Sequence, residues 1–122
     1  REGPDPHNLV MLPGTSSTDE MVSGTRKGIL VTRFWYDNVV DSKKTLMTGL
    51  SRDGTFLIEN GKITRAVGSL RYNESILGGF SRAQALGRNL KGFSFGTSHI
   101  ACPSMLIEEF CFTGSREKYQ DW

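Results

Sequence analysis

The segment TGLSRDGTFLIENGKITR, residues 48–65, carries two turn-forming dipeptides, Asp53-Gly54 and Asn60-Gly61, on either side of five residues. Both dipeptides tolerate positive φ, which a two-residue hairpin turn requires if its twist is to match that of the strands it joins. Between them, Phe56 and Ile58 point to one side and their neighbours to the other, the period of two that a strand imposes. We therefore predict a three-stranded antiparallel meander with strands at about 45–50, 55–59 and 62–67.

The flanking sequence predicts more strands and a few short helices. Strands are expected at 7–12, at 28–36, where GILVTRFWY reads as a central strand covered on both sides, and after Pro103 in SMLIEEFCF. Ser17 and Glu20 form a capping box for a helix that ends at Gly24. A second helix is expected at 81–87, with Asn73 or Ser75 as a possible cap nearby, and residues 89–98 as an irregular glycine-rich stretch. The predicted fold class is α+β and β-rich, with an antiparallel meander, hairpins and two or three short helices.

Composition limits the possible functions. The 122 residues, 37% hydrophobic and 23% charged, suit one soluble domain, assigned to residues 1–114 with a polar tail at 115–122. The net charge of +2 comes without a Lys/Arg run, which argues against nucleic acid as a partner. We find neither a signal peptide nor a membrane-spanning segment, so the cytoplasm is the expected location. The polar start at Arg1 indicates the middle of a longer protein.

Residues able to perform chemistry are sparse. His7 and His99 are the two histidines, and neither belongs to an HExxH-type pair. His99 and Cys102 are three apart, so they are weak metal-ligand candidates for a site completed elsewhere, or a Cys–His nucleophile pair, or simply a loop histidine beside a buried thiol. Cys102 and Cys111 lie nine apart in one expected strand, roughly 30 Å when extended, which excludes a disulfide between them. From the residues alone, the chain is a β-rich module without a self-contained active site.

Four motifs in order resemble the C-terminal part of the TldD/PmbA family, zinc metallopeptidases also known as modulators of DNA gyrase. They are RFWY at 33–36, TGLSRDGTFLIENGKI at 48–63, RYNES at 71–75 and PSMLIEEF at 103–110. The resemblance runs from about Asn8 to Gly114. It implies that the meander belongs to the shared framework of that C-terminal domain.

The resemblance also implies where the chemistry of the full-length protein resides. Active members use an HExxxH helix for two zinc ligands and the catalytic glutamate, and these 122 residues do not contain that helix. They also supply a cysteine ligand from the C-terminal domain before its last strand. Here residues 89–101 contain no cysteine, and Cys102 directly precedes Pro103. This departure is what a noncatalytic paralogue paired with an active subunit would show; zinc is expected, if at all, in the full-length protein.

The expected function is therefore a C-terminal domain that forms a wall of a peptide-binding cleft and part of a dimer interface. Its partners would be the N-terminal part of the same protein, a homo- or heterodimeric family member, and a peptide substrate held by strand addition. Arg52, Arg71 and Asn73 are the candidate contacts with substrate or partner, against the alternative of ordinary surface polarity. Two other functions stay open: a noncatalytic assembly or binding subunit, one that touches gyrase for example, and a thiol enzyme that uses Cys102 and His99.

Overall fold

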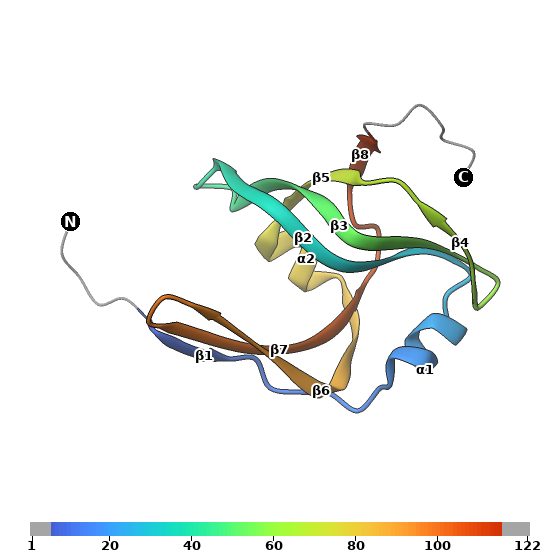
Figure 1. Cartoon of the computed structure of the whole chain (residues 1–122), viewed down its shortest axis with the longest axis horizontal. Coiled ribbons are helices and arrows are strands. Elements are labelled where there is room, and N and C mark those ends of the chain that lie inside the picture. Colours follow the sequence, from blue (N-terminus) through green and yellow to red (C-terminus); the bar gives the residue numbers. More distant parts are fainter. Residues whose placement is uncertain (1–5, 116–122) are drawn as a thin grey trace.

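The computed structural model describes residues 6–115, which form two β-sheets and two short helices (Figure 1). A three-stranded sheet has the order β1-β7-β6, and a five-stranded sheet has the order β2-β3-β5-β8 with β4 paired to β3. All pairings are antiparallel except that of β1 with β7. The elements are β1 (Asn8–Val10), α1 (Thr18–Ser23), β2 (Lys27–Asp41), β3 (Leu46–Glu59), β4 (Lys62–Val67), β5 (Leu70–Ser75), α2 (Ile76–Ser81), β6 (Ala83–Phe95), β7 (Ser98–Ile107) and β8 (Phe112–Ser115).

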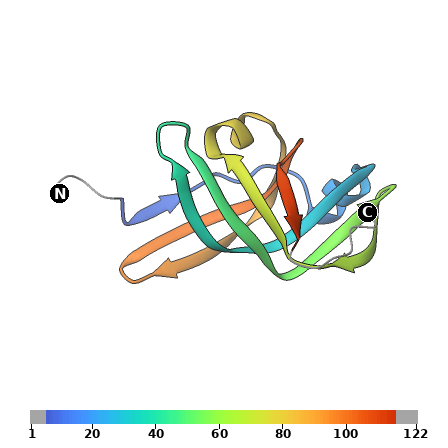
Figure 2. The same ribbon diagram turned by 90° about the horizontal axis from the view of Figure 1, so that it is seen from above.

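The predicted β-rich α+β class is confirmed. The five-stranded sheet lies above the three-stranded one in Figure 1, and Figure 2 shows the strands of the two sheets crossing each other. Residues 116–122 of the predicted polar tail lie outside the described part of the chain.

The first predicted turn of the meander is wrong, because Asp53-Gly54 forms a bulge inside the continuous strand β3. Asp53 has φ 62° and Gly54 φ 118°. The pairing of β3 with β2 shifts at this point, from Val31 opposite Thr55 to Arg33 opposite Arg52. Positive φ suits a bulge as well as a turn. Because β3 pairs with β2 both before and after the dipeptide, the chain continues in the same direction as one strand.

The second predicted turn is confirmed. Glu59 pairs with Lys62 across Asn60-Gly61, and both turn residues have positive φ, 51° and 80°. The turn rests on the segment after α1, because the Asn60 and Gly61 amides donate to the Arg26 and Thr25 carbonyls at 2.7 and 2.8 Å.

The predicted strand at 28–36 is present as part of β2, but it does not have the predicted central place in the sheet. Strand β2 runs from Lys27 to Asp41, beyond the predicted end at residue 36, and it occupies one end of the five-stranded sheet. Among residues 6–115 it pairs with β3 alone. It is therefore an edge strand, with an exposed end at Tyr36 and Val39, instead of a central strand covered on both sides.

The predicted helix at 81–87 and the predicted irregular stretch at 89–98 are both wrong. Ser75 caps α2 by accepting from the Gly78 amide at 3.1 Å, and this helix ends at Ser81. From Ala83 to Phe95 the chain is strand β6, paired along its length with β7. Helix propensity is a weak preference of a few tenths of a kcal/mol per residue, and cross-strand pairing overrides it here.

The last predicted strand is divided between the two sheets. Strand β7 begins before Pro103, which lies opposite Leu90, and ends at Ile107. Glu109 then takes φ 56°, and β8 joins β5 in the other sheet. The apolar run after Pro103 therefore contributes a strand to each of the two sheets.

Helix α1 has the predicted capping box. The Glu20 amide donates to Ser17 Oγ at 3.0 Å, and the Ser17 amide donates to the Glu20 carboxylate at 3.1 Å. These bonds, with the nearby Arg88 guanidinium, hold the pKa of Glu20 below its ordinary value. Met21 is buried and Gly24 caps the C-terminus, as predicted.

The buried core is small and centres on the five-stranded sheet. Its apolar members are Met21, Leu57, Ile58, Leu70 and Tyr72. The Tyr72 ring packs against Phe34 and Phe110 with centroids 4.6 and 5.6 Å apart. Its hydroxyl donates to Asp37 Oδ1 at 2.6 Å, which fixes β2 at the irregular stretch between Trp35 and Asn38.

The raised pKa of Tyr72 predicts that the free energy of unfolding falls at alkaline pH. Burial, and then its hydrogen bond to Asp37, raise the pKa of Tyr72 well above its ordinary value of about 10. This contribution is fully present below about pH 10 and is lost as the pH rises toward the folded-state pKa, because the unfolded chain releases the phenolic proton first. Urea unfolding above pH 10 should therefore show the free energy of unfolding falling more steeply in the wild type than in Tyr72→Phe. Equal slopes in the two proteins would contradict the assignment.

Candidate functional site

The three predicted contact residues lie on one face of the five-stranded sheet. Arg71 pairs with Leu50 and Asn73 pairs with Thr48, and Arg52 lies two positions beyond Leu50 on β3. Directly paired residues, and residues two apart on a strand, project to the same face. The structure therefore brings together side chains that the sequence places up to 21 residues apart.

This face is the outer one. The alternate residues of β3 and β5 face the core, and Gly49, Ser51, Tyr72 and Glu74 are all buried. Arg52 and Arg71 are exposed, as an antiparallel sheet with one solvated face allows.

Strand β2 adds two residues that sequence reasoning missed. Arg33 pairs with Arg52 and Trp35 pairs with Leu50, so both project to the outer face. The guanidinium carbons of Arg33 and Arg52 lie 5.0 and 4.8 Å from the centre of the Trp35 ring. The prediction of a strand covered on both sides at 28–36 is wrong for Trp35, which is 37% exposed. The signal that could have placed it is the alternation with Arg33, two positions earlier. We call Arg33, Trp35, Arg52 and Arg71 the arginine face.

The neighbouring polar residues differ in how firmly they are held. Arg71 Nη1 donates to Thr48 Oγ1 at 3.3 Å, a long bond that leaves most of its donors unused. The Asn73 side-chain amide donates to Thr113 Oγ1 at 3.0 Å and joins β5 to β8. Asn73 therefore has a structural bond within the sheet, whereas Arg71 is free to contact a ligand.

The arginine face has an excess of positive charge. Arg33 pairs with the Asp53 carboxylate at 3.0 Å. Among residues 6–115, the structure gives no ion pair to Arg52 or Arg71. Guanidinium groups bind carboxylates and phosphates with paired donors, so the face is chemically suited to an anionic partner.

The weak metal candidates do not form a site together. His99 and Cys102 both lie in β7, three positions apart, and so project to opposite faces of the strand. His99 Nδ1 is 3.0 Å from Ser94 Oγ on β6. Within the described part of the chain, no three His, Cys, Asp or Glu side chains gather as a metal site would require. Cys102 and Cys111 are free thiols, as predicted, although Cys102 lies in β7 and Cys111 in the connection from β7 to β8 instead of one strand.

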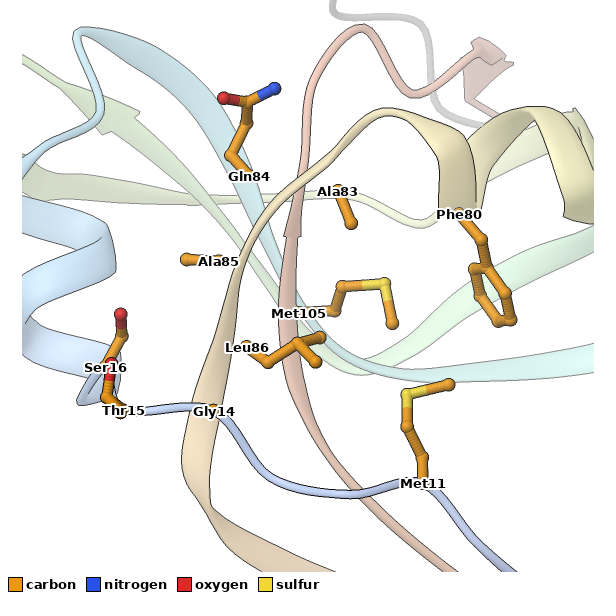
Figure 3. A pocket seen from close by; sticks show the side chains of 10 residues that line it. All are labelled: Met11, Gly14, Thr15, Ser16, Phe80, Ala83, Gln84, Ala85, Leu86 and Met105. Carbon is orange, nitrogen blue, oxygen red and sulfur yellow. The ribbon is translucent and has the colours of Figure 1, made fainter.

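A separate hollow of about 590 Å³ lies where α2, β6, β7 and the segment after β1 meet. Figure 3 shows Met11, Leu86 and Met105 close to one another, with Phe80 of α2 at one end. Most of its lining side chains are apolar, with Thr15, Ser16 and Gln84 as the polar ones, so this hollow is a mainly apolar surface.

The comparison with family models decides the family. Residues 1–114 match the model described as the PmbA/TldA metallopeptidase C-terminal domain. The chain belongs to this family. The TldD/PmbA resemblance read from the four motifs is therefore confirmed, over nearly the same residues.

Solved structures share the fold of this PmbA/TldA C-terminal domain. TldE from Thermococcus kodakarensis matches with a TM-score of 0.73 at 15% identity over 86% of the chain. Two proteins described as candidate modulators of DNA gyrase also match. One, from Thermotoga maritima, has a TM-score of 0.73 at 20% identity over 87% of the chain, and the other, from Bacteroides thetaiotaomicron, 0.70 at 28% over 86%.

The PmbA/TldA domain is a minor part of these relatives. The chain covers 23%, 24% and 22% of the three solved proteins, so it spans about a quarter of their length. Curated proteins gave no match. No helix among the described residues is long and apolar enough to cross a membrane.

Proposed function

We propose that this chain is the C-terminal domain of a TldD/PmbA-like protein and forms one wall of its peptide-binding cleft and part of its dimer interface. The observation that supports this most strongly is the arginine face, where exposed guanidinium groups gather around Trp35 on the outer side of the five-stranded sheet. In this proposal the wall binds and orients a peptide. Peptide cleavage would be performed by the rest of the full-length protein, which in the three solved relatives is about three quarters of the chain.

Exposed apolar side chains support the interface part of the proposal. Exposed large apolar residues include Leu9, Val10 and Leu12 near β1, Val39 and Val40 on β2, and Leu77 and Phe80 on α2. Clustered apolar exposure on a soluble domain marks surfaces that another domain or subunit covers. We therefore propose that the N-terminal part of the protein and a second subunit cover these residues.

A noncatalytic subunit is the second candidate, and a specific observation favours it. The domain of an active member is expected to supply a cysteine ligand before the strand that we predicted after Pro103. Residues 89–101 contain no cysteine, and Cys102 and His99 point to opposite faces of β7. The residues present do not fit a zinc ligand set, and we derive no catalytic step through zinc.

Native mass spectrometry of the protein purified from its source, with metal retained, tests the proposal. A longer chain or complex carrying one zinc per site is the result expected for a peptidase to which this domain contributes a wall. An assembly of intact chains without metal would instead support the noncatalytic subunit. A 122-residue monomer with no further chain attached would overturn both candidates.

A further inference from the structure

We propose that the arginine face binds an extended acidic peptide segment that lies along the open edge of β2. This inference rests on the proposed function, since it names the chemistry of the peptide that the cleft wall holds. Three observations carry it: the charge of the face, the stacking that holds its guanidinium groups, and the unpaired edge beside them.

Charge complementarity identifies carboxylates as the ligand groups. The outer face presents the guanidinium groups of Arg33, Arg52 and Arg71, and one carboxylate, that of Asp53, contacts them. Asp53 shows that a carboxylate is accommodated here, at 3.0 Å from Arg33. Arg52 and Arg71 have no such partner within the described residues, so a ligand carboxylate would supply what the domain itself lacks.

The face is ordered before any ligand arrives. Arg33 and Arg52 both stack on Trp35, whereas Arg71 has only a long hydrogen bond to Thr48. Stacking on an aromatic ring restrains a long side chain without using its hydrogen-bond donors. Less side-chain entropy is then lost on binding, which strengthens an interaction that is weak between freely moving surface charges.

The open edge of β2 gives the segment its conformation. Within residues 6–115, β2 pairs with β3 on one side only. An extended peptide added to the other side would place alternate side chains on the outer face, about 5 Å from those of β2. An acidic side chain at that position would point toward Arg33 and Trp35, and alternate acidic residues would follow the same row.

Peptide carboxylates fit this face better than nucleic acid does. The three arginines span the adjacent strands β2, β3 and β5, roughly 10 Å in all. Nucleic-acid surfaces generally contact a longer run of phosphates with many Lys and Arg side chains, and this chain has a net charge of +2 without such a run. Single-stranded DNA is therefore a competitor to be measured.

Trp35 is a built-in reporter for the test. The chain has two tryptophans, Trp35 and Trp122, so Trp122→Phe leaves Trp35 as the sole indole. In that background, blocked peptides of about ten residues with alternating Glu-Thr, Gln-Thr or Lys-Thr are titrated while the fluorescence of Trp35 is followed. We expect the Glu-Thr peptide to bind more tightly than the Gln-Thr peptide, with an affinity that falls as salt is added, and the Lys-Thr peptide not to bind.

Matched variants locate the binding. Arg52→Gln should weaken binding of the Glu-Thr peptide by roughly two- to fivefold, because the Arg52 guanidinium lies over Trp35 of β2. Arg71→Gln should weaken it less, because Arg71 lies on β5, two strands away from β2. Arg26→Gln removes the same charge from an exposed arginine seven positions before Arg33 and should leave the affinity unchanged. Far-UV circular dichroism of all variants separates a binding defect from unfolding.

Contrary outcomes are equally specific. Equal binding of the Glu-Thr and Gln-Thr peptides, or an equal loss in Arg26→Gln, would overturn the inference. So would single-stranded DNA that displaces the acidic peptide at lower concentration. If acidic peptides bind as expected but the native mass spectrum shows a 122-residue monomer, the proposed function fails and the binding site stands. If instead the native mass spectrum shows a longer chain or complex but acidic peptides do not bind preferentially, the proposed cleft wall stands and the acidic-peptide inference fails.

Discussion

Replacing Gly49 with alanine is expected to lower the free energy of unfolding by about 2–3 kcal/mol. Gly49 is buried in the middle of β3, opposite Tyr72. A Cβ at this position would lie 2.5 Å from Asp37 Oδ1, 2.6 Å from Tyr72 Cε2 and 3.1 Å from the Trp35 carbonyl oxygen. All three neighbours belong to the contact that joins β2 to the core, so the added methyl must break the Tyr72–Asp37 hydrogen bond or push the strands apart.

Gly92→Ala is the matched control for this variant. Gly92 is also in a strand, β6, but a Cβ there would meet nothing within 4 Å. Alanine also restricts the unfolded chain, so Gly92→Ala should be neutral or stabilising by less than about 1 kcal/mol. Urea denaturation of the two variants at neutral pH measures the difference. A Gly49→Ala protein as stable as Gly92→Ala would show that the strands are not held this closely.

Truncating Leu57 to alanine should have the largest effect of all, about 3 kcal/mol off the free energy of unfolding. Leu57 is 2% exposed and lies in β3, paired with Ile29 of β2 and Arg65 of β4. The strand is held on both sides there, so it has little freedom to close the space that the lost methyl groups leave. Few other apolar side chains are this deeply buried in the described residues, so each of them contributes a large share of the stability.

Leu77→Ala makes the same chemical change at a surface position. Leu77 lies in α2 and is 69% exposed. Alanine is the better helix former, so the isolated chain should change by less than about 0.5 kcal/mol. The two variants are compared by thermal and urea unfolding of the 122-residue chain. A Leu57→Ala variant that loses no more stability than Leu77→Ala would contradict the assignment of the core to β3.

Features that depend only on residues close together in the sequence could be predicted. The capping box of Ser17 and Glu20 requires only residues three apart, and the Asn60-Gly61 turn requires only two residues that tolerate positive φ. The two cysteines are free as predicted, but the premise of one extended strand was wrong, because β7 ends at Ile107 before Cys111. The capping box and the hairpin turn are each formed by residues close together in the sequence, so they depend little on the rest of the fold.

Asp53-Gly54 shows where local signals become ambiguous. The same positive φ values serve a hairpin turn or a bulge, and only the presence of β2 alongside β3 selects the bulge. Residues 83–87 show the same limit for helices. Their helix propensity is real, but it is smaller than the gain from pairing with β7, whose residues lie about 20 positions further along the chain.

The candidate site was predictable in part. Arg52, Arg71 and Asn73 were named individually, and the register of β3 with β5 brings them to one face. Arg33 and Trp35 were missed, because a run of aromatic residues suits a buried strand as well as an edge strand. The position of β2 at the end of the sheet decides between these two readings, and the sequence contains no local signal for strand order.

The sequence by itself determined the family, the β-rich class, one helix cap and one hairpin turn, because motifs and short-range backbone preferences carry that information. The tertiary structure alone decided which strand is at the edge, which dipeptide bends the chain, and which arginines share a face. These depend on pairings between residues far apart in the sequence, and a one-residue shift in register would turn every side chain of a strand to the other face.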